Sequence, residues 1–72
     1  MSDNQIREYL LNYIVDKLTE YYIIDTNSTI EKALEKVYNS KIYSAISHPD
    51  SYLLSYSPSY LYYRMMEEQD VA

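Results

Sequence analysis

The 72-residue sequence contains no glycine. Glycine adopts positive φ at no steric cost, and the tight turns of β-hairpins depend strongly on it. Its absence also excludes the glycine-built loops that cradle phosphates and the Gly-x-Ser-x-Gly elbow of hydrolases. We therefore predict an all-α fold, a small bundle whose helices are joined by short polar links.

The sequence also has no cysteine and a single histidine, His48. Disulfides and the usual structural zinc sites are thereby excluded. A general base needs a pocket and an orienting partner, whereas Asp50 lies only two residues from His48 and suits a local turn hydrogen bond. We expect no catalytic, cofactor-binding or metal-binding residue, no small-molecule substrate and no enzymatic activity.

Basic residues are few, since six Lys and Arg face eleven Asp and Glu for a net charge of −5. Nucleic-acid-binding proteins gather Lys and Arg on one face to neutralise phosphates, which this sequence does not do. It has no run of about 18 apolar residues for a membrane span, and its polar start is unlike a secretory signal. We expect a cytoplasmic protein that contacts neither nucleic acid nor membrane.

The first helix is predicted at about residues 3–22, capped by Ser2 or Asp3. Residues 22–24 could extend this helix or leave it. Its apolar residues form two adjacent stripes: Ile6, Leu10, Tyr13, Ile14 and Tyr21 in one, Leu11, Val15, Leu18 and Tyr22 in the other. This apolar arc is wider than the roughly 100° of an ordinary surface helix. The helix is therefore either the central helix of the domain or a dimer helix.

The second helix is predicted at about residues 29–39, after the polar break at 25–28. The segment from Ser28 to Glu31 matches a capping box, and the apolar residues that follow have helical spacing. The same apolar phase continues to Ile46, so residues 29–47 could form one helix or two. We favour a break at 39–40 and a short extra helix at about 41–47, because Asn and Ser suit caps better than helix interiors.

The remainder of the chain contains a turn, a link and a third main helix. Pro49 marks the turn at 47–51, and residues 52–54 are predicted to be an extended link. Ser57 and Pro58 suit the cap and first position of a helix at about 58–68. We expect one helical domain over residues 1–72, with a frayed tail at 69–72.

Eleven tyrosines supply all the aromatic residues, since Phe and Trp are absent. So short a chain cannot bury every ring, and exposed tyrosines make good binding anchors. Without a disulfide or metal, so small a domain needs either unusually good packing or a partner. The candidate interface residues are Leu11, Val15, Leu18, Tyr22, Tyr60 and Tyr63.

Two runs of the second half carry a resemblance. They are Tyr-Asn-Ser-Lys-Ile-Tyr at 38–43 and Ser-Pro-Ser-Tyr-Leu-Tyr at 57–62. Over roughly residues 30–68 the chain resembles short uncharacterised bacterial helical proteins that look like products of toxin–antitoxin or mobile-element loci. In those proteins the loop before the last helix often contains glycine, which this chain replaces with Ser-Tyr-Leu-Leu at 51–54. The resemblance implies a helical fold, and it offers no established catalytic residue that could be carried over to this chain.

Two functional hypotheses follow. The leading one is a small bacterial protein-interaction module, a homodimer with a regulatory or accessory role, whose protein partner is itself or another protein. The alternative is an acidic inhibitor that mimics nucleic-acid charge and blocks a DNA-binding enzyme. The scattered carboxylates favour the first, because a mimic needs them clustered on one face.

Overall fold

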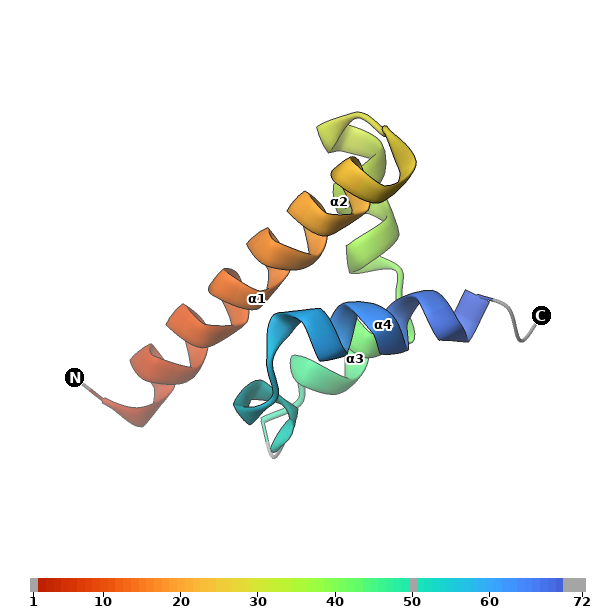
Figure 1. Cartoon of the computed structure of the whole chain (residues 1–72). Coiled ribbons are helices and arrows are strands. Elements are labelled where there is room, and N and C mark those ends of the chain that lie inside the picture. Colours follow the sequence, from red (N-terminus) through yellow and green to blue (C-terminus); the bar gives the residue numbers. More distant parts are fainter. Residues whose placement is uncertain (1, 50, 70–72) are drawn as a thin grey trace.

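The computed structural model describes residues 2–49 and 51–69 and confirms the all-α prediction (Figure 1). Within these residues there is no β-strand. The elements are α1 (Asp3–Thr26), α2 (Ile30–Tyr38), α3 (Lys41–Ile46), the 3-10 turn η1 (Leu53–Ser55) and α4 (Pro58–Gln69).

Helix α1 begins at the cap Ser2 and continues four residues past the predicted end at 22. The Ser2 hydroxyl accepts a hydrogen bond from the Gln5 backbone NH at 3.3 Å, and the Gln5 side chain accepts one from the Ser2 NH at 3.0 Å. The helix ends at Asn27, whose φ of 56° is left-handed. Asparagine tolerates this conformation, so it provides the cap that glycine usually provides.

The capping box predicted at Ser28 is wrong, because α2 begins one residue later. Its cap is Thr29, whose hydroxyl accepts a hydrogen bond from the Lys32 NH at 3.3 Å. The residue three positions after this cap is Lys32 rather than Glu31, so no reciprocal bond can form. The Ser28 hydroxyl instead lies 2.5 Å from that of Thr26.

The break between α2 and α3 is confirmed at residues 39–40. The Ser40 hydroxyl donates to the Val37 carbonyl at 2.6 Å and accepts from the Tyr43 NH at 3.0 Å. A single side chain therefore satisfies a carbonyl at the end of α2 and an NH at the start of α3. Helix α3 ends at Ile46, one residue before its predicted end.

The extended link predicted at 52–54 is wrong, because η1 occupies residues 53–55. The Ser51 hydroxyl accepts from the Leu53 NH at 3.1 Å, and the Ser55 hydroxyl donates to the Tyr52 carbonyl at 2.7 Å. Serine side chains can bond to nearby backbone in this way and so favour turns over extended chain. The preceding loop is tied to α1 by Arg7, which donates to the carbonyls of His48 at 2.6 Å and Ser51 at 3.3 Å.

Helix α4 begins as predicted, with Pro58 at its first position and the Ser57 hydroxyl accepting from the Tyr60 NH at 3.3 Å. Gln69 is still helical, so the predicted frayed tail does not begin there. Residues 70–72, the rest of that predicted tail, lie outside the described residues.

Helix α1 makes the most extensive contacts in the domain, because it packs against α2, α4 and η1. Its 24 residues correspond to about 36 Å at 1.5 Å per residue, close to the molecule's longest extent of 37 Å. The core draws on all four helices: Ile14, Val15, Leu18, Ala33, Val37, Ile42, Ile46, Leu61 and Met65. Thr19 is buried beside them, and its hydroxyl donates to the Val15 carbonyl at 2.7 Å.

Burial in the core should determine how much an isoleucine side chain contributes to stability. Ile14 is 2% exposed and Ile30 is 62% exposed, so they form a matched pair. Replacing Ile14 with Ala should lower the free energy of unfolding by about 2–5 kcal/mol, and Ile14→Val by about 1 kcal/mol. Ile30→Ala should change it by less than about 0.5 kcal/mol. Urea denaturation measures all three, and equal losses for both alanine variants would contradict the assigned core.

The Ser40 hydroxyl should stabilise the joint between α2 and α3. Ser40→Ala should lower the free energy of unfolding by about 1 kcal/mol, because it removes the hydroxyl that caps α3. Ser44→Ala is the control, since Ser44 is an exposed residue within α3. If thermal or urea unfolding shows the same stability for the two variants, the capping role of Ser40 is wrong.

Candidate interaction surfaces

The structure divides the predicted interface residues into core and surface. Val15 and Leu18 are 4% and 0% exposed, so predicting them as interface residues is wrong. The neighbouring helices of the same chain cover this stripe of α1. Leu11 and Tyr22 are half-buried and pack against the core. Tyr60 and Tyr63 are 39% and 64% exposed and stay candidates for binding a partner.

Three tyrosines from η1 and α4 form a continuous row on the surface. The ring centroids of Tyr52 and Tyr56 lie 6.1 Å apart, and those of Tyr56 and Tyr60 lie 5.1 Å apart. The Arg64 guanidinium lies 5.9 Å from the Tyr60 ring centroid and donates to its hydroxyl at 2.9 Å. We call Tyr52, Tyr56, Tyr60 and Arg64 the tyrosine row.

The row forms because residues 53–55 fold into the turn η1 and are not extended as predicted. Its residues recur every four positions, and the turn brings Tyr52 and Tyr56 into line with the first turns of α4. All three rings remain at least 39% exposed. The spacing of four residues was visible in the sequence. In an extended segment, however, the Tyr52 ring would not lie beside the Tyr56 ring.

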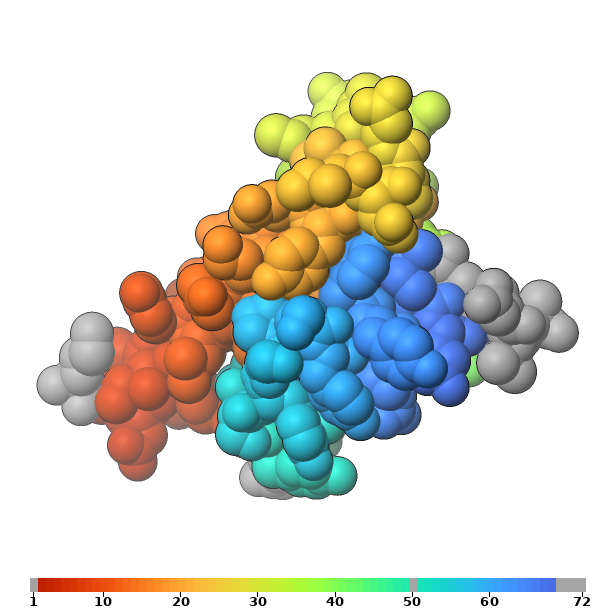
Figure 2. Space-filling model, in the orientation of Figure 1, coloured from red at the N-terminus to blue at the C-terminus, as the bar shows by residue number. Residues whose placement is uncertain are grey.

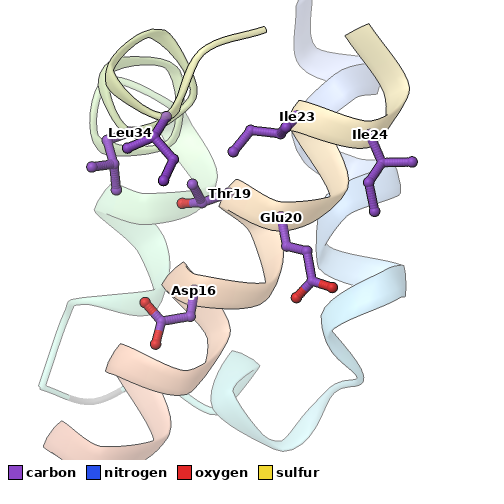
Figure 3. A pocket seen from close by; sticks show the side chains of 7 residues that line it. Asp16, Thr19, Glu20, Ile23, Ile24 and Leu34 are labelled. Atoms are coloured by element: carbon purple, nitrogen blue, oxygen red, sulfur yellow. The ribbon is translucent and has the colours of Figure 1, made fainter. Parts of the chain in front are cut away.

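A second surface is a groove between the end of α1 and α2, with a volume of about 400 Å³. Ile23 of α1 and Leu34 of α2 approach it from opposite sides (Figure 3). Asp16 and Glu20 lie nearer the N-terminal end of α1. Ile24 and Ile30 also line it and are 73% and 62% exposed. Sequence reasoning missed this groove because it left open whether residues 22–24 extend the helix or leave it.

The side of α1 that faces away from the core is also uncovered. Figure 2 shows α1, red to orange, along one edge of the molecule with no other element over its upper flank. We call the following residues the outer face, because they share the arc of α1 that is turned away from the core: Ile6, Tyr9, Tyr13, Asp16, Lys17, Glu20 and Ile24. The Lys17 ammonium lies 3.6 Å from the Glu20 carboxylate and 5.9 Å from the Tyr13 ring centroid.

Tyr62 ties the end of α1 to α4. Its hydroxyl donates to the Asp25 carboxylate at 2.9 Å, and its ring meets that of Tyr21 edge-on at 5.7 Å between centroids. Partial burial raises the pKa of the Tyr62 phenol well above its usual range, and the hydrogen bond and negative charge of Asp25 raise it further. A phenol held protonated in this way serves as a hydrogen-bond donor.

The described residues contain no group of three or more His, Cys, Asp and Glu side chains that could hold a metal ion. His48 lies in the exposed turn before Pro49, and its carbonyl accepts the hydrogen bond from Arg7. Within residues 2–49 and 51–69, no helix combines the length and the apolar character needed to cross a membrane.

The sequence matches no family model, no curated protein and no solved structure. The resemblance to short bacterial helical proteins therefore stays a prediction.

The Tyr62–Asp25 bond should make stability depend on alkaline pH. The folded protein keeps the Tyr62 proton at a pH where an unfolded tyrosine, with a pKa of about 10, has lost it. The stabilisation is complete below about pH 10 and is lost as the pH rises above it. In Tyr62→Phe, the free energy of unfolding should fall less steeply as the pH rises above about 10. Urea denaturation at a series of alkaline pH values measures this dependence.

Tyr63→Phe is the control for this measurement, because the exposed Tyr63 ring leaves the Tyr62–Asp25 bond intact. Tyrosinate absorbance provides a second readout. The difference between the titrations of the native protein and Tyr62→Phe should show one phenol that ionises above pH 10. A difference curve centred at about pH 10 would refute the raised pKa.

Proposed function

We propose that this chain is a small protein-interaction module of the bacterial cytoplasm, homodimeric and with a regulatory or accessory role rather than an enzymatic one. The observation that carries the proposal is the tyrosine row. Three neighbouring aromatic rings are exposed at the surface, although the small core of this domain contains few large apolar residues.

The row has the properties of a binding anchor. Tyrosine offers a large apolar ring and a hydroxyl while losing the freedom of only two side-chain torsions. The rings of Tyr56 and Tyr60 already contact each other, and Arg64 is bonded to Tyr60. Because these side chains are ordered before binding, a partner that covers them immobilises less. Tyr and Arg are also the residues that most often dominate binding energy at interfaces.

The alternative, an acidic mimic of nucleic acid, has weaker support. A mimic needs carboxylates gathered on one face without intervening cations. On the outer face of α1, Lys17 lies directly after Asp16 and forms an ion pair with Glu20. The tyrosine row contains Arg64 and no carboxylate.

The proposal is tested by the double variant Tyr56→Ala/Tyr60→Ala. Both rings are partly exposed, and circular dichroism verifies that the variant folds. Affinity purification from the native host identifies a partner of the unmodified chain, and binding to that purified partner is then measured. We expect the double variant to bind it at least about 10-fold more weakly, because anchor residues contribute about 1.4 kcal/mol or more.

Tyr38→Ala is the matched control, because Tyr38 is 50% exposed on α2 and lies outside the row. It should bind the partner like the native chain. Equal affinity for all three proteins would refute a binding role for the row. If the partner were instead a basic DNA-binding enzyme held through salt-sensitive contacts that the double variant keeps, the acidic mimic would replace the proposal.

A further inference from the structure

Tyr56 and Tyr60 are the closest pair of rings in the tyrosine row. Their ring centroids lie 5.1 Å apart, and the angle between the ring planes is 33°. The Tyr52 ring lies farther from Tyr56, at 6.1 Å and 59°. Both members of the close pair reach solvent, since Tyr56 is 42% exposed and Tyr60 is 39% exposed. Two phenols are therefore held in contact at a surface that dissolved reagents can reach.

Hydrogen bonds fix the two residues relative to each other. The Tyr56 NH donates to the Leu53 carbonyl at 3.1 Å, which places Tyr56 at the end of η1. The Tyr60 NH donates to the Ser57 hydroxyl at 3.3 Å in the first turn of α4. Arg64 holds the outer end of the ring by donating to the Tyr60 hydroxyl at 2.9 Å. Groups that are held together in this way react with each other far faster than the same groups free in solution.

The composition of the chain directs one-electron oxidation to tyrosine. Cysteine and tryptophan are the other side chains that readily lose one electron, and this sequence contains neither. A radical formed on any of the eleven tyrosines therefore has no thiol or indole in the chain to which it can pass. It stays a phenoxyl radical until it meets a second tyrosine or an external reductant.

We infer that Tyr56 and Tyr60 form a site of oxidative cross-linking, at which a peroxide and a haem peroxidase convert the two phenols into dityrosine. Each phenol loses one electron and one proton, and the two radicals join through a carbon–carbon bond between ring positions beside the hydroxyls. The hydrogens on those two carbons then move to the oxygens, which restores both aromatic phenols. Hydrogen peroxide takes up the two electrons and two protons and leaves as two water molecules. This modification is independent of the proposed binding role.

Ring orientation favours this pair over the other tyrosines. In dityrosine the two rings lie side by side with a modest twist, so the 33° angle of the proposed pair is closer to the product than a perpendicular contact is. Tyr38 and Tyr43 are as close, with centroids 4.8 Å apart, but they meet edge-on at 77°. Tyr9 and Tyr13 are exposed and also lie four positions apart, yet none of the ring contacts among the described residues joins them.

The cross-link changes the tyrosine row permanently. It joins the end of η1 to the first turn of α4 through a carbon–carbon bond, which the thiols that reduce a disulfide do not cleave. Both hydroxyls remain, so the row keeps its hydrogen-bonding groups while its two central rings become one rigid unit. A single oxidation event is thereby recorded in the covalent structure of the chain.

Peroxidase treatment of the full chain tests the site. The native protein is treated with a haem peroxidase and limiting hydrogen peroxide at a series of micromolar protein concentrations. We expect a monomeric product with dityrosine fluorescence, lighter by two hydrogen atoms, whose yield does not change with protein concentration. Tandem mass spectrometry of its peptides should place the new bond between Tyr56 and Tyr60. Oxidised methionine gains an oxygen atom, so its mass distinguishes it from the cross-link.

Tyr60→Phe keeps the ring but removes the phenol, so it should give at least about 10-fold less of the monomeric product. Tyr63→Phe is the matched control, because Tyr63 is also exposed on α4 but lies outside the row. It should give the native yield, and circular dichroism verifies the fold of each variant. A native yield from Tyr60→Phe, a cross-link that maps to another pair of tyrosines, or cross-linked dimers alone would overturn the assignment. Treatment that leaves the native chain without any cross-link would overturn it as well.

Discussion

Burial of the inner stripe of α1 is the interaction on which the rest of the structure depends. Ile14, Val15 and Leu18 lie at the centre of the core, which α2, α3 and α4 complete from the other side. A domain of this size has little other apolar surface to bury, and without cysteine it has no disulfide to stabilise it. The shorter helices are six to twelve residues long, a length that is marginal in isolation, so they depend on packing in this core.

This arrangement also explains which surfaces remain for binding. Because the inner stripe of α1 is covered within the chain, a partner has access to the outer face, the groove beside α2 and the tyrosine row. The row is built by η1 and α4, whereas the outer face belongs to α1 alone.

Local signals predicted the helices well and the joints less well. The apolar spacing of α2 and the Ser57–Pro58 start of α4 were readable because each is a short-range pattern with a known physical cause. The true cap of α2, Thr29, was missed because Ser28 fits the same pattern one residue earlier. The end of α1 was misplaced because Asn27 adopts a left-handed cap, which its residue type permits but does not require.

The candidate surfaces were less predictable than the fold. The two apolar stripes of α1 looked equivalent in the sequence, and nothing local indicated that Val15 and Leu18 would be covered within the chain while Ile6 and Tyr13 would stay exposed. Exposed tyrosines were expected from their number alone. Their alignment into a row required the turn η1, in a segment that the sequence predicts to be an extended link.

The sequence by itself determined that this protein is helical, because the absence of glycine, the helical apolar periodicity and the serine, threonine and asparagine caps all act over a few residues. The tertiary structure decided which face of α1 is core and which tyrosines share a surface. Both outcomes depend on how the helices cross, which brings together residues such as Asp25 and Tyr62 that lie 37 positions apart. Contacts at such separations leave no local pattern in a chain.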